Sequence, residues 1–236
     1  MATVRQFTFL KRKPGLTVED FTSAWGNGHA SRLLANETFW SSAAGYRQNR
    51  VLPAIAEFTP EPLWDGVVQI ELADKTSAPD LIRYDPFARN AGLEEEDFVD
   101  PEQMVQFVAE AKVVLDGPAR GIKILSLPRR KAGLSPAEFS RHYREVHGAL
   151  VARNEAFKKY ANRYVQHHAR PETVKATAGF VPYDGISEFW FDSLDHAWAA
   201  WAAPSYMAEL RADEKNFVGS PPSHRLLVEE VLFPRL

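Results

Sequence analysis

Three residue types recur together in this chain in a pattern that could support proton-transfer chemistry. Phe139, Tyr143 and His147 follow one another at intervals of four residues. The same arrangement occurs 118 positions earlier, at Phe21, Trp25 and His29. Because the ordinary pKa of histidine lies near neutrality, its imidazole suits general acid or base work. His147 and His29 are therefore candidate catalytic residues, and Tyr143 is a candidate for orienting His147.

The position of His147 on a regular helix favours access to a cleft. The apolar stripe of that helix would consist of Phe139, Tyr143, Val146 and Leu150. At about 100° per residue, His147 lies at the edge of this stripe, roughly 60° from its axis. Its ring could then reach a space between the helix and a sheet. A structural alternative stays open: each histidine caps a helix end or bonds a nearby carbonyl, with Gly28 and Gly148 marking a break.

Two strand-like segments supply partners for such a site. Alternation places Tyr164, Gln166 and His168 on one face of the first, and Ile186, Glu188 and Trp190 on one face of the second. Glu188 stands among aromatic residues, and a carboxylate there must be paired or have a raised pKa. It either helps Tyr143 and Tyr164 to orient His147, or forms an ion pair with an arginine such as Arg163. The candidate pocket residues are Trp25, Gln166, His168 and Trp190.

The remaining aromatic and titratable residues carry weaker signals. Trp198 and Trp201 lie three apart on a predicted helix, which is typical of core packing rather than of a substrate platform. The histidines expected at the surface are His167, His196 and His224. His142 and His147 are five apart, the wrong helical separation for shared metal ligation, and no His-Glu-X-X-His sequence occurs. No glycine-rich phosphate loop or Gly-X-Ser-X-Gly elbow is present, so we predict no metal and no cofactor.

The repeated motif is one part of a longer internal correspondence. Tyr46 and Gln48 precede Tyr164 and Gln166 by 118 positions, and Asp65-Gly66 precedes Asp184-Gly185 by 119. The chain is therefore predicted to be two homologous halves, residues 1–116 and 119–236, joined at the turn-like Asp116-Gly117-Pro118.

The elements expected in each half follow the order β-α-β-β-α-β. Strands are predicted near residues 4–9, 43–51, 67–72 and 104–115, and near 122–127, 160–168, 186–191 and 226–233. Helices are predicted to begin after Thr17, Ser135 and Ser193, with another over 204–217. The stretch 76–101 predicts only fragmentary helix. This is an α+β chain of two ferredoxin-like repeats. Because helices cover only one face of each sheet, we expect the sheets to pack into a closed or nearly closed barrel with the helices outside.

Composition limits the function classes. The chain has 236 residues, 45% of them hydrophobic, and a formal net charge of −3. Such a balance gives no electrostatic footprint for nucleic acid, and no apolar run is long enough to span a membrane. There are no cysteines, which excludes disulfides and thiolate chemistry. The first residues resemble a strand rather than a secretory signal, so a cytoplasmic protein is expected.

These motifs resemble the EthD family of dimeric α/β barrels. The similarity is carried by Gly133-Leu134-Ser135-Pro136, by Arg144-Glu145-Val146-His147-Gly148 and by Asp184-Gly185-Ile186 with the residues that follow to Ser193. It covers 122–218 closely and the first half more loosely, where Gln69 and Glu71 stand for Glu188 and Trp190. The resemblance implies the barrel fold. It also implies a place among accessory proteins of ether degradation, cofactor-free decarboxylases or dehydratases, lactone isomerases and small monooxygenases.

Together these observations predict a cofactor-independent lyase or isomerase that acts on a hydrophobic, oxygenated aromatic or lactone-like molecule. The second half keeps more titratable residues, so the single working pocket is expected there. The alternative is a non-catalytic accessory protein that binds a small molecule, or heme, since distant barrel relatives hold heme through a single histidine. A homodimer is possible but not required, because the duplication already supplies the pairing.

Overall fold

A computed structural model describes residues 3–53, 55, 62–73, 97–176, 183–219 and 223–233 of the chain. Its strands are β1 Val4–Leu10, β2 Ala43–Val51, β3 Gly66–Leu72, β4 Val105–Leu115, β5 Ile122–Leu127, β6 Ala161–Ala169, β7 Lys175–Ala176, β8 Gly185–Phe191 and β9 His224–Phe233. These strands confirm the predicted strand positions to within two residues at nearly every end. The stretch predicted as fragmentary helix lies mostly outside the described residues.

The helices fall into two groups, one in each half. In the first half they are α1 Val18–Ser23, the π-helix η1 Ala24–His29, α2 Ala30–Leu34, α3 Glu37–Ser42 and the short 3₁₀-helix η3 Pro101–Gln103. In the second half they are α6 Pro136–Arg141, the π-helix η4 His142–His147, α7 Gly148–Arg153, α8 Glu155–Tyr160, the 3₁₀-helix η5 Pro171–Thr173, α9 Leu194–Ala202, the π-helix η6 Tyr206–Leu210 and α10 Arg211–Phe217. None of the described helices is long and apolar enough to cross a bilayer.

Eight antiparallel strands close into a barrel. The order is β1-β3-β2-β9-β5-β8-β6-β4, and β4 pairs back to β1, while β7 adds to β4. The two halves join edge to edge, through β2 with β9 and through β4 with β6. The expected barrel is therefore present as one continuous sheet rather than as two sheets stacked face to face.

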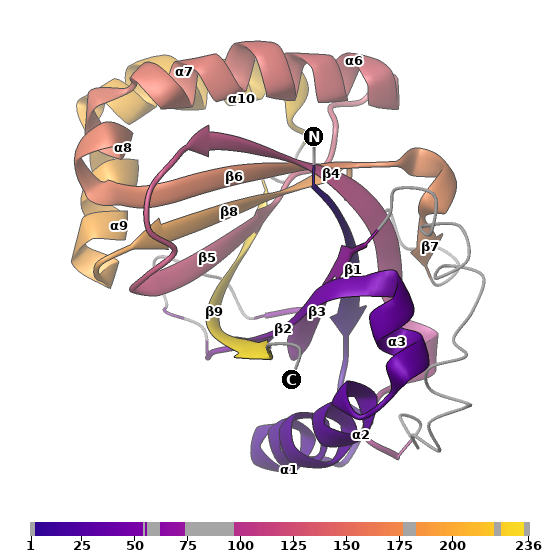
Figure 1. Ribbon diagram of the computed structural model, residues 1–236. Helices are drawn as coiled ribbons and strands as arrows, with labels where there is room; N and C mark the ends of the chain where they lie inside the picture. Colours follow the sequence, from indigo (N-terminus) through magenta and orange to yellow (C-terminus); the bar gives the residue numbers. More distant parts are fainter. Residues whose placement is uncertain are drawn as a thin grey trace.

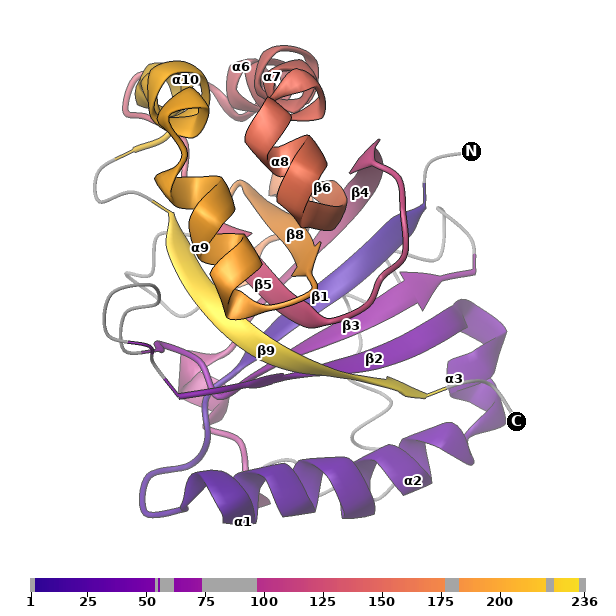
Figure 2. The same cartoon turned by 90° about the vertical axis from the view of Figure 1, so that its left-hand side faces the viewer.

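Helices cover the outside of this barrel on opposite sides, with α1, α2 and α3 on one side and α6 to α10 on the other (Figures 1 and 2). Matching turns start the two long helical segments. Gly15 and Gly133 both have a φ of 92°, a conformation that glycine adopts without strain. Thr17 with Asp20, and Ser135 with Glu138, then form a capping box at each helix start.

Strand alternation separates an inner from an outer layer of side chains. The inner apolar core includes Phe7, Phe9, Phe107, Leu125 and Ile186. On the outer face of the second half, Tyr164 and Phe189 pack against Phe157 and Trp201 of the helices. The outer layer of the second half is the one that carries the cleft described next.

Candidate functional site

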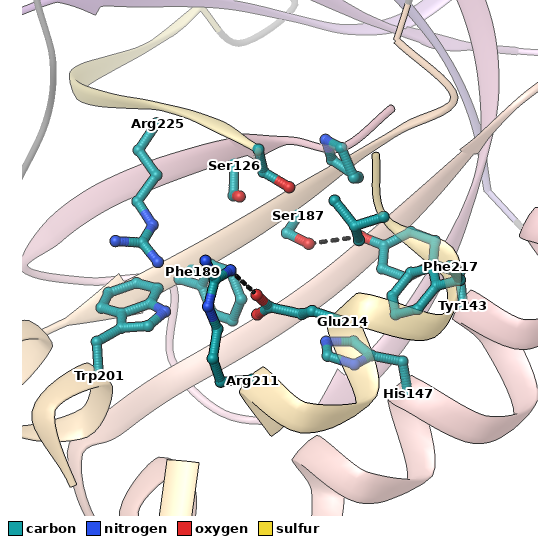
Figure 3. Close-up of a pocket in the computed structure, with 13 residues that line it drawn as sticks. Ser126, Tyr143, His147, Ser187, Phe189, Trp201, Arg211, Glu214, Phe217 and Arg225 are labelled. Atoms are coloured by element: carbon teal, nitrogen blue, oxygen red, sulfur yellow. Dashed lines mark hydrogen bonds and ion pairs between the residues drawn. The ribbon is translucent and has the colours of Figure 1, made fainter. Parts of the chain in front are cut away.

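A narrow cleft lies between the helices of the second half and the outer face of strands β5, β8 and β9. It is lined by Ser126, Pro128, Tyr143, His147, Ser187, Phe189, Trp201, Arg211, Glu214, Phe217, Val218, Ser223 and Arg225. Figure 3 shows His147 and Tyr143 on one side of this space, Ser187 on the sheet, and Arg211, Arg225 and Trp201 toward one end. Its free volume is about 50 Å³, which holds one or two water molecules rather than an aromatic ring.

His147 enters the cleft with one ring nitrogen already bound. Its Nδ1 lies 3.0 Å from Oδ2 of Asp213 on α10, and the histidine is buried. A carboxylate on Nδ1 fixes the tautomer in which Nδ1 carries the hydrogen, so Nε2 is left as the basic atom. This arrangement suits a general base that faces a ligand in the cleft.

The same carboxylate holds a second histidine. Nε2 of His142 lies 2.8 Å from Oδ1 of Asp213, and the His142 ring stacks on Phe217 at 4.8 Å. Burial alone would raise the pKa of Asp213, but hydrogen bonds from His147 and His142 hold that pKa below its ordinary value. Asp213 is therefore an anion at neutral pH, with one imidazole ring on each of its two oxygens.

Sequence reasoning missed Asp213, although a signal was present. Tyr206, Leu210 and Phe217 are buried on one side of η6 and α10, and Asp213 interrupts that apolar side at helical spacing. An acid on an apolar helix face must have a partner. Neither histidine was assigned to it, because an α-helix would point His142 and His147 in different directions.

A chain of hydroxyl groups forms the floor of the cleft. The Tyr143 hydroxyl lies 2.5 Å from Oγ of Ser187, and the Tyr164 hydroxyl lies 3.3 Å from the same oxygen. Burial raises the pKa of Tyr143 well above its usual range and that of Tyr164 to about 12. Both phenols thus keep their hydrogens at neutral pH and can donate hydrogen bonds. Ser187, a further residue that the sequence did not single out, connects them.

Glu188 and Trp190 do not belong to this cleft. They point into the barrel, on the opposite face of β8 from Ser187, so Glu188 cannot orient His147. Glu188 pairs with Lys123 at 2.8 Å, with His167 at 2.8 Å and with Arg5 at 3.5 Å.

The Glu188 cluster corrects several expectations. Glu188 does form an ion pair with an arginine, but that arginine is Arg5. Arg163, the expected partner, pairs with Asp116 instead. His167 is fully buried inside the barrel rather than at the surface. Burial lowers the pKa of His167, while Lys123, His167 and Arg5 outweigh burial and hold the pKa of Glu188 well below normal.

Gln166 and His168 support the helix rather than line the cleft. Nε2 of Gln166 donates to the Tyr143 carbonyl oxygen at 2.8 Å, and Nδ1 of His168 lies 3.1 Å from Oγ of Ser140. Burial and the nearby Arg144 lower the pKa of His168 to about 3, so this histidine is neutral.

His29 and Trp25 lie in the helix layer of the first half, on the other side of the barrel from the cleft (Figure 2). Burial and the charge of Arg32 lower the pKa of His29 to about 4. The Trp25 ring is buried against Phe21. His29 is therefore neutral at pH 7 and a weaker base than an ordinary histidine.

The buried face of the helix is shifted by one residue from the predicted stripe. Val146 is 44% exposed, whereas His147 is 8% and Val151 is 1% exposed. The π-helix η4 explains the shift, because it contains one residue more per turn than an α-helix. The two predicted core tryptophans also differ: Trp201 is buried and lines the cleft, but Trp198 is 48% exposed.

A heme does not fit this cleft, as the described residues form it. His147 could offer Nε2 as a ligand, but Phe217 and Tyr143 occupy the space beside it, with ring centroids 5.0 and 6.2 Å from that of His147. The free volume of about 50 Å³ is far below the roughly 300 Å³ of small cofactor pockets. Among the described residues, no group of three or more His, Cys, Asp or Glu side chains is placed to hold a metal ion.

Comparisons with known proteins agree with the fold. A search of the curated proteins finds no match. An anthrone oxidase-like protein has a TM-score of 0.60 at 10% identity, over 100% of this chain and 95% of its own. A candidate monooxygenase from Lactobacillus acidophilus NCFM has a TM-score of 0.52 at 8% identity, over 100% and 97%. A candidate chlorite dismutase has a TM-score of 0.51 at 10% identity, over 98% and 96%.

Identities this low establish the fold alone. The family model described as EthD domain matches residues 131–221, the segment that carries η4, β6, β8 and α10. Residues 131–221 therefore match the EthD domain, within a chain that shares its fold with these solved structures.

Proposed function

We propose that the second half of this chain is a cofactor-independent enzyme in which His147 is the general base. The observation that carries the proposal is the His147–Asp213 pair at the edge of the cleft, at 3.0 Å. A carboxylate on Nδ1 supports a base at Nε2 and stabilises the imidazolium that forms after proton transfer.

The reaction begins with removal of a proton from carbon next to a carbonyl group. Nε2 of His147 takes the proton, and the electron pair of the C–H bond moves to the carbonyl oxygen to give an enolate. The Tyr143 and Ser187 hydroxyls both line the cleft; one donates its hydrogen bond to that oxygen while the other donates to its partner in the hydroxyl chain. If His147 returns the proton to a different carbon, the reaction is an isomerisation. If the enolate expels a leaving group, which takes the proton, the reaction is that of a lyase.

The substrate class follows from the walls of the cleft. Phe189, Phe217 and Trp201 are aromatic, while Arg225 lies over the Trp201 ring at 4.8 Å. These walls suit a hydrophobic, oxygenated aromatic or lactone-like molecule. Because the free volume is small, only its reacting edge would enter. An anthrone oxidase-like protein with the same fold is consistent with an enolisable aromatic substrate.

The test is hydrogen exchange of two probes, anthrone and a five-membered unsaturated lactone. In anaerobic D₂O, the protein should accelerate exchange of the acidic C–H, as followed by proton NMR. His147→Ala should slow that exchange by about 10²–10⁴-fold. The matched variant His29→Ala, at the equivalent position of the first half, should retain the wild-type rate within about twofold.

Two outcomes would contradict this assignment. If His29→Ala were the more damaging variant, the working site would lie in the first half. If neither probe exchanged faster with the protein than with buffer, yet anthrone bound by calorimetry, the alternative of a non-catalytic accessory protein would replace it.

We further propose that residues 1–116 and 119–236 are tandem copies of one ferredoxin-like unit. The equivalent turns, capping boxes and π-helices at offsets of 118 support this interpretation. A single chain then completes the barrel, so a homodimer is not required, and a cytoplasmic location remains our expectation.

A further inference from the structure

The π-helix η4 carries both cleft residues of its helix, Tyr143 and His147. In an α-helix the Tyr143 carbonyl would accept a hydrogen bond from the backbone N–H of His147. Here it accepts from Gly148, five residues on. Single π turns inside α-helices are rare and frequently occur at functional sites.

Gln166 on β6 binds the same carbonyl. Its Nε2 donates to the Tyr143 oxygen at 2.8 Å, and its side chain is fully buried. A carbonyl oxygen has two lone pairs, so it accepts from Gln166 and Gly148 together. The approach is close, because a Cβ at position 148 would lie 3.0 Å from Oε1 of Gln166. The strand therefore holds the helix at the residue where its hydrogen-bond pattern changes.

The π turn decides whether His147 meets Asp213. At about 100° per residue, side chains five apart on an α-helix point roughly 140° away from each other. In η4 the bond from residue i to residue i+5 brings such side chains onto one face. His142 and His147 can then bind the two oxygens of one carboxylate, at 2.8 and 3.0 Å.

We infer that Gln166 is a positioning residue that maintains this π turn and thereby aims His147. Gln166 itself does not line the cleft and contacts it only through the backbone of Tyr143. Its role in turnover depends on the proposed function, whereas its role in setting the histidine geometry does not.

The first half contains the same device. Nε2 of Gln48 donates to the Trp25 carbonyl at 3.0 Å, and the Ala30 N–H donates to the same oxygen. The charged neighbour that acts on His29 is Arg32. Gln48 thus makes the same contact as Gln166 and lies outside the proposed machinery, which makes it a matched control.

The experiment compares Gln166→Met with Gln48→Met, since methionine keeps the length of the side chain and removes the donor. Long-range ¹⁵N–¹H NMR of the histidine rings reports which nitrogen of His147 carries the hydrogen. In the wild type we expect Nδ1–H; in Gln166→Met that preference should be lost. Proton exchange of the anthrone probe should fall by about 10- to 100-fold with its binding constant unchanged.

Gln48→Met should keep both the His147 tautomer and the exchange rate. Its melting temperature should fall by about as much as that of Gln166→Met, because each variant loses one buried hydrogen bond to a helix carbonyl. If the two variants lose the same stability but only Gln166→Met loses the Nδ1–H tautomer of His147, then Gln166 positions His147 and does not merely stabilise the fold.

A second variant covers the case in which Gln166→Met fails to fold. Gly148→Ala keeps the Gln166 side chain but adds a methyl group that displaces its amide from the Tyr143 carbonyl. The equivalent position of the first half is already an alanine, Ala30. Gly148→Ala should shift the His147 tautomer in the same direction with a smaller loss of exchange. Persistence of the Nδ1–H tautomer in both Gln166→Met and Gly148→Ala would overturn the inference. If the tautomer changed as expected while wild-type protein showed no turnover, the proposed function would fail and the positioning role would stand.

Discussion

His147 and His29 occupy equivalent places in two similar helices, yet the charged side chains beside the two rings differ. Each is the last residue of a π-helix, and each ring lies against a phenylalanine, Phe217 or Phe98. His147 has the carboxylate of Asp213 on Nδ1, whereas His29 has the guanidinium of Arg32 nearby. A neighbouring anion supports a proton on the ring and a neighbouring cation opposes it. The π-helix is common to both halves, and the charged side chain beside the ring differs between them.

The sheet beneath the two helices differs in the same way. In the first half the Trp25 ring lies over Gly66, where a Cβ would come within 2.4 Å of it. In the second half Tyr143 lies near Gly185, with a Cβ distance of 3.1 Å. The phenol reaches a serine, Ser187, but the equivalent position in the first half is Val68. A glycine makes room for an aromatic ring in both halves, and only the second half adds a hydroxyl chain.

The largest effect should come from removing the charge that distinguishes His147. Asp213→Asn keeps the size of the side chain but offers an amide that no longer stabilises an imidazolium, and it favours the wrong tautomer. Anthrone exchange should slow by about 10²–10⁴-fold, as for loss of a proton-transfer group. His142→Asn, which removes only the second histidine, is the control and should cost less. An Asp213→Asn variant with the wild-type rate would remove the basis for distinguishing the two histidines.

The barrel interior offers the next largest effect, since Arg5 and Lys123 are equivalent residues that both pair with Glu188. Lys123 is 2% exposed and also pairs with Glu230, whereas the Arg5 side chain is 16% exposed. Lys123→Met should lower the free energy of unfolding by about 3–5 kcal/mol, because it leaves buried carboxylates poorly compensated. Arg5→Met should cost about 1 kcal/mol. Urea unfolding measures both free energies. Equal losses in the two variants would show that Arg5 and Lys123 contribute equally to compensating the buried carboxylates.

The strand pattern was largely predictable from the sequence, and the reasons are local. β5 and β2 have the predicted bounds, because alternating apolar residues and flanking turns mark them directly. The closed barrel followed from helices on one face of each sheet. Tyr143, His147 and Tyr164 were also predicted to share a site. Tyr143 and His147 line the cleft, and Tyr164 is connected to it only through the Ser187 hydroxyl.

The rest depended on geometry that the pattern does not contain. Assuming a regular α-helix placed Val146 in the core and kept His142 apart from His147, whereas the π turn reverses both. Asp213 lies 66 residues from His147, and spacing alone gave no reason to pair them. Alternation correctly grouped Glu188 with Trp190, but it does not say which face of a strand lies inside a barrel.

A smaller effect should follow from changing the neighbour of His29. Arg32→Gln removes the cation but not the burial, which is the larger cause of the lowered pKa. The pKa of His29 should rise above about 4 and stay below its ordinary 6.5. NMR titration measures it directly, with Arg50→Gln as the control.

The pH dependence of the free energy of unfolding gives a second measurement of the effect of Arg32→Gln on His29. A histidine whose pKa is lower in the folded state loses its contribution to stability as the pH falls from about 6.5 toward the folded pKa. Arg32→Gln should therefore reduce the loss of stability between pH 6.5 and pH 4. An unchanged His29 pKa would mean that burial alone sets it.

The pairing of β2 with β9 also has a consequence for how the chain folds. This seam joins Tyr46–Val51 to Val228–Phe233, which are among the most distant segments of the sequence. Contacts of such long range slow folding, because the entropy of closing a large loop is lost before the contact forms. During synthesis the edge of β2 has no partner until the last strand leaves the ribosome. An unpaired edge can add a strand from another chain, so the nascent first half is the stage at which this protein is most exposed to aggregation.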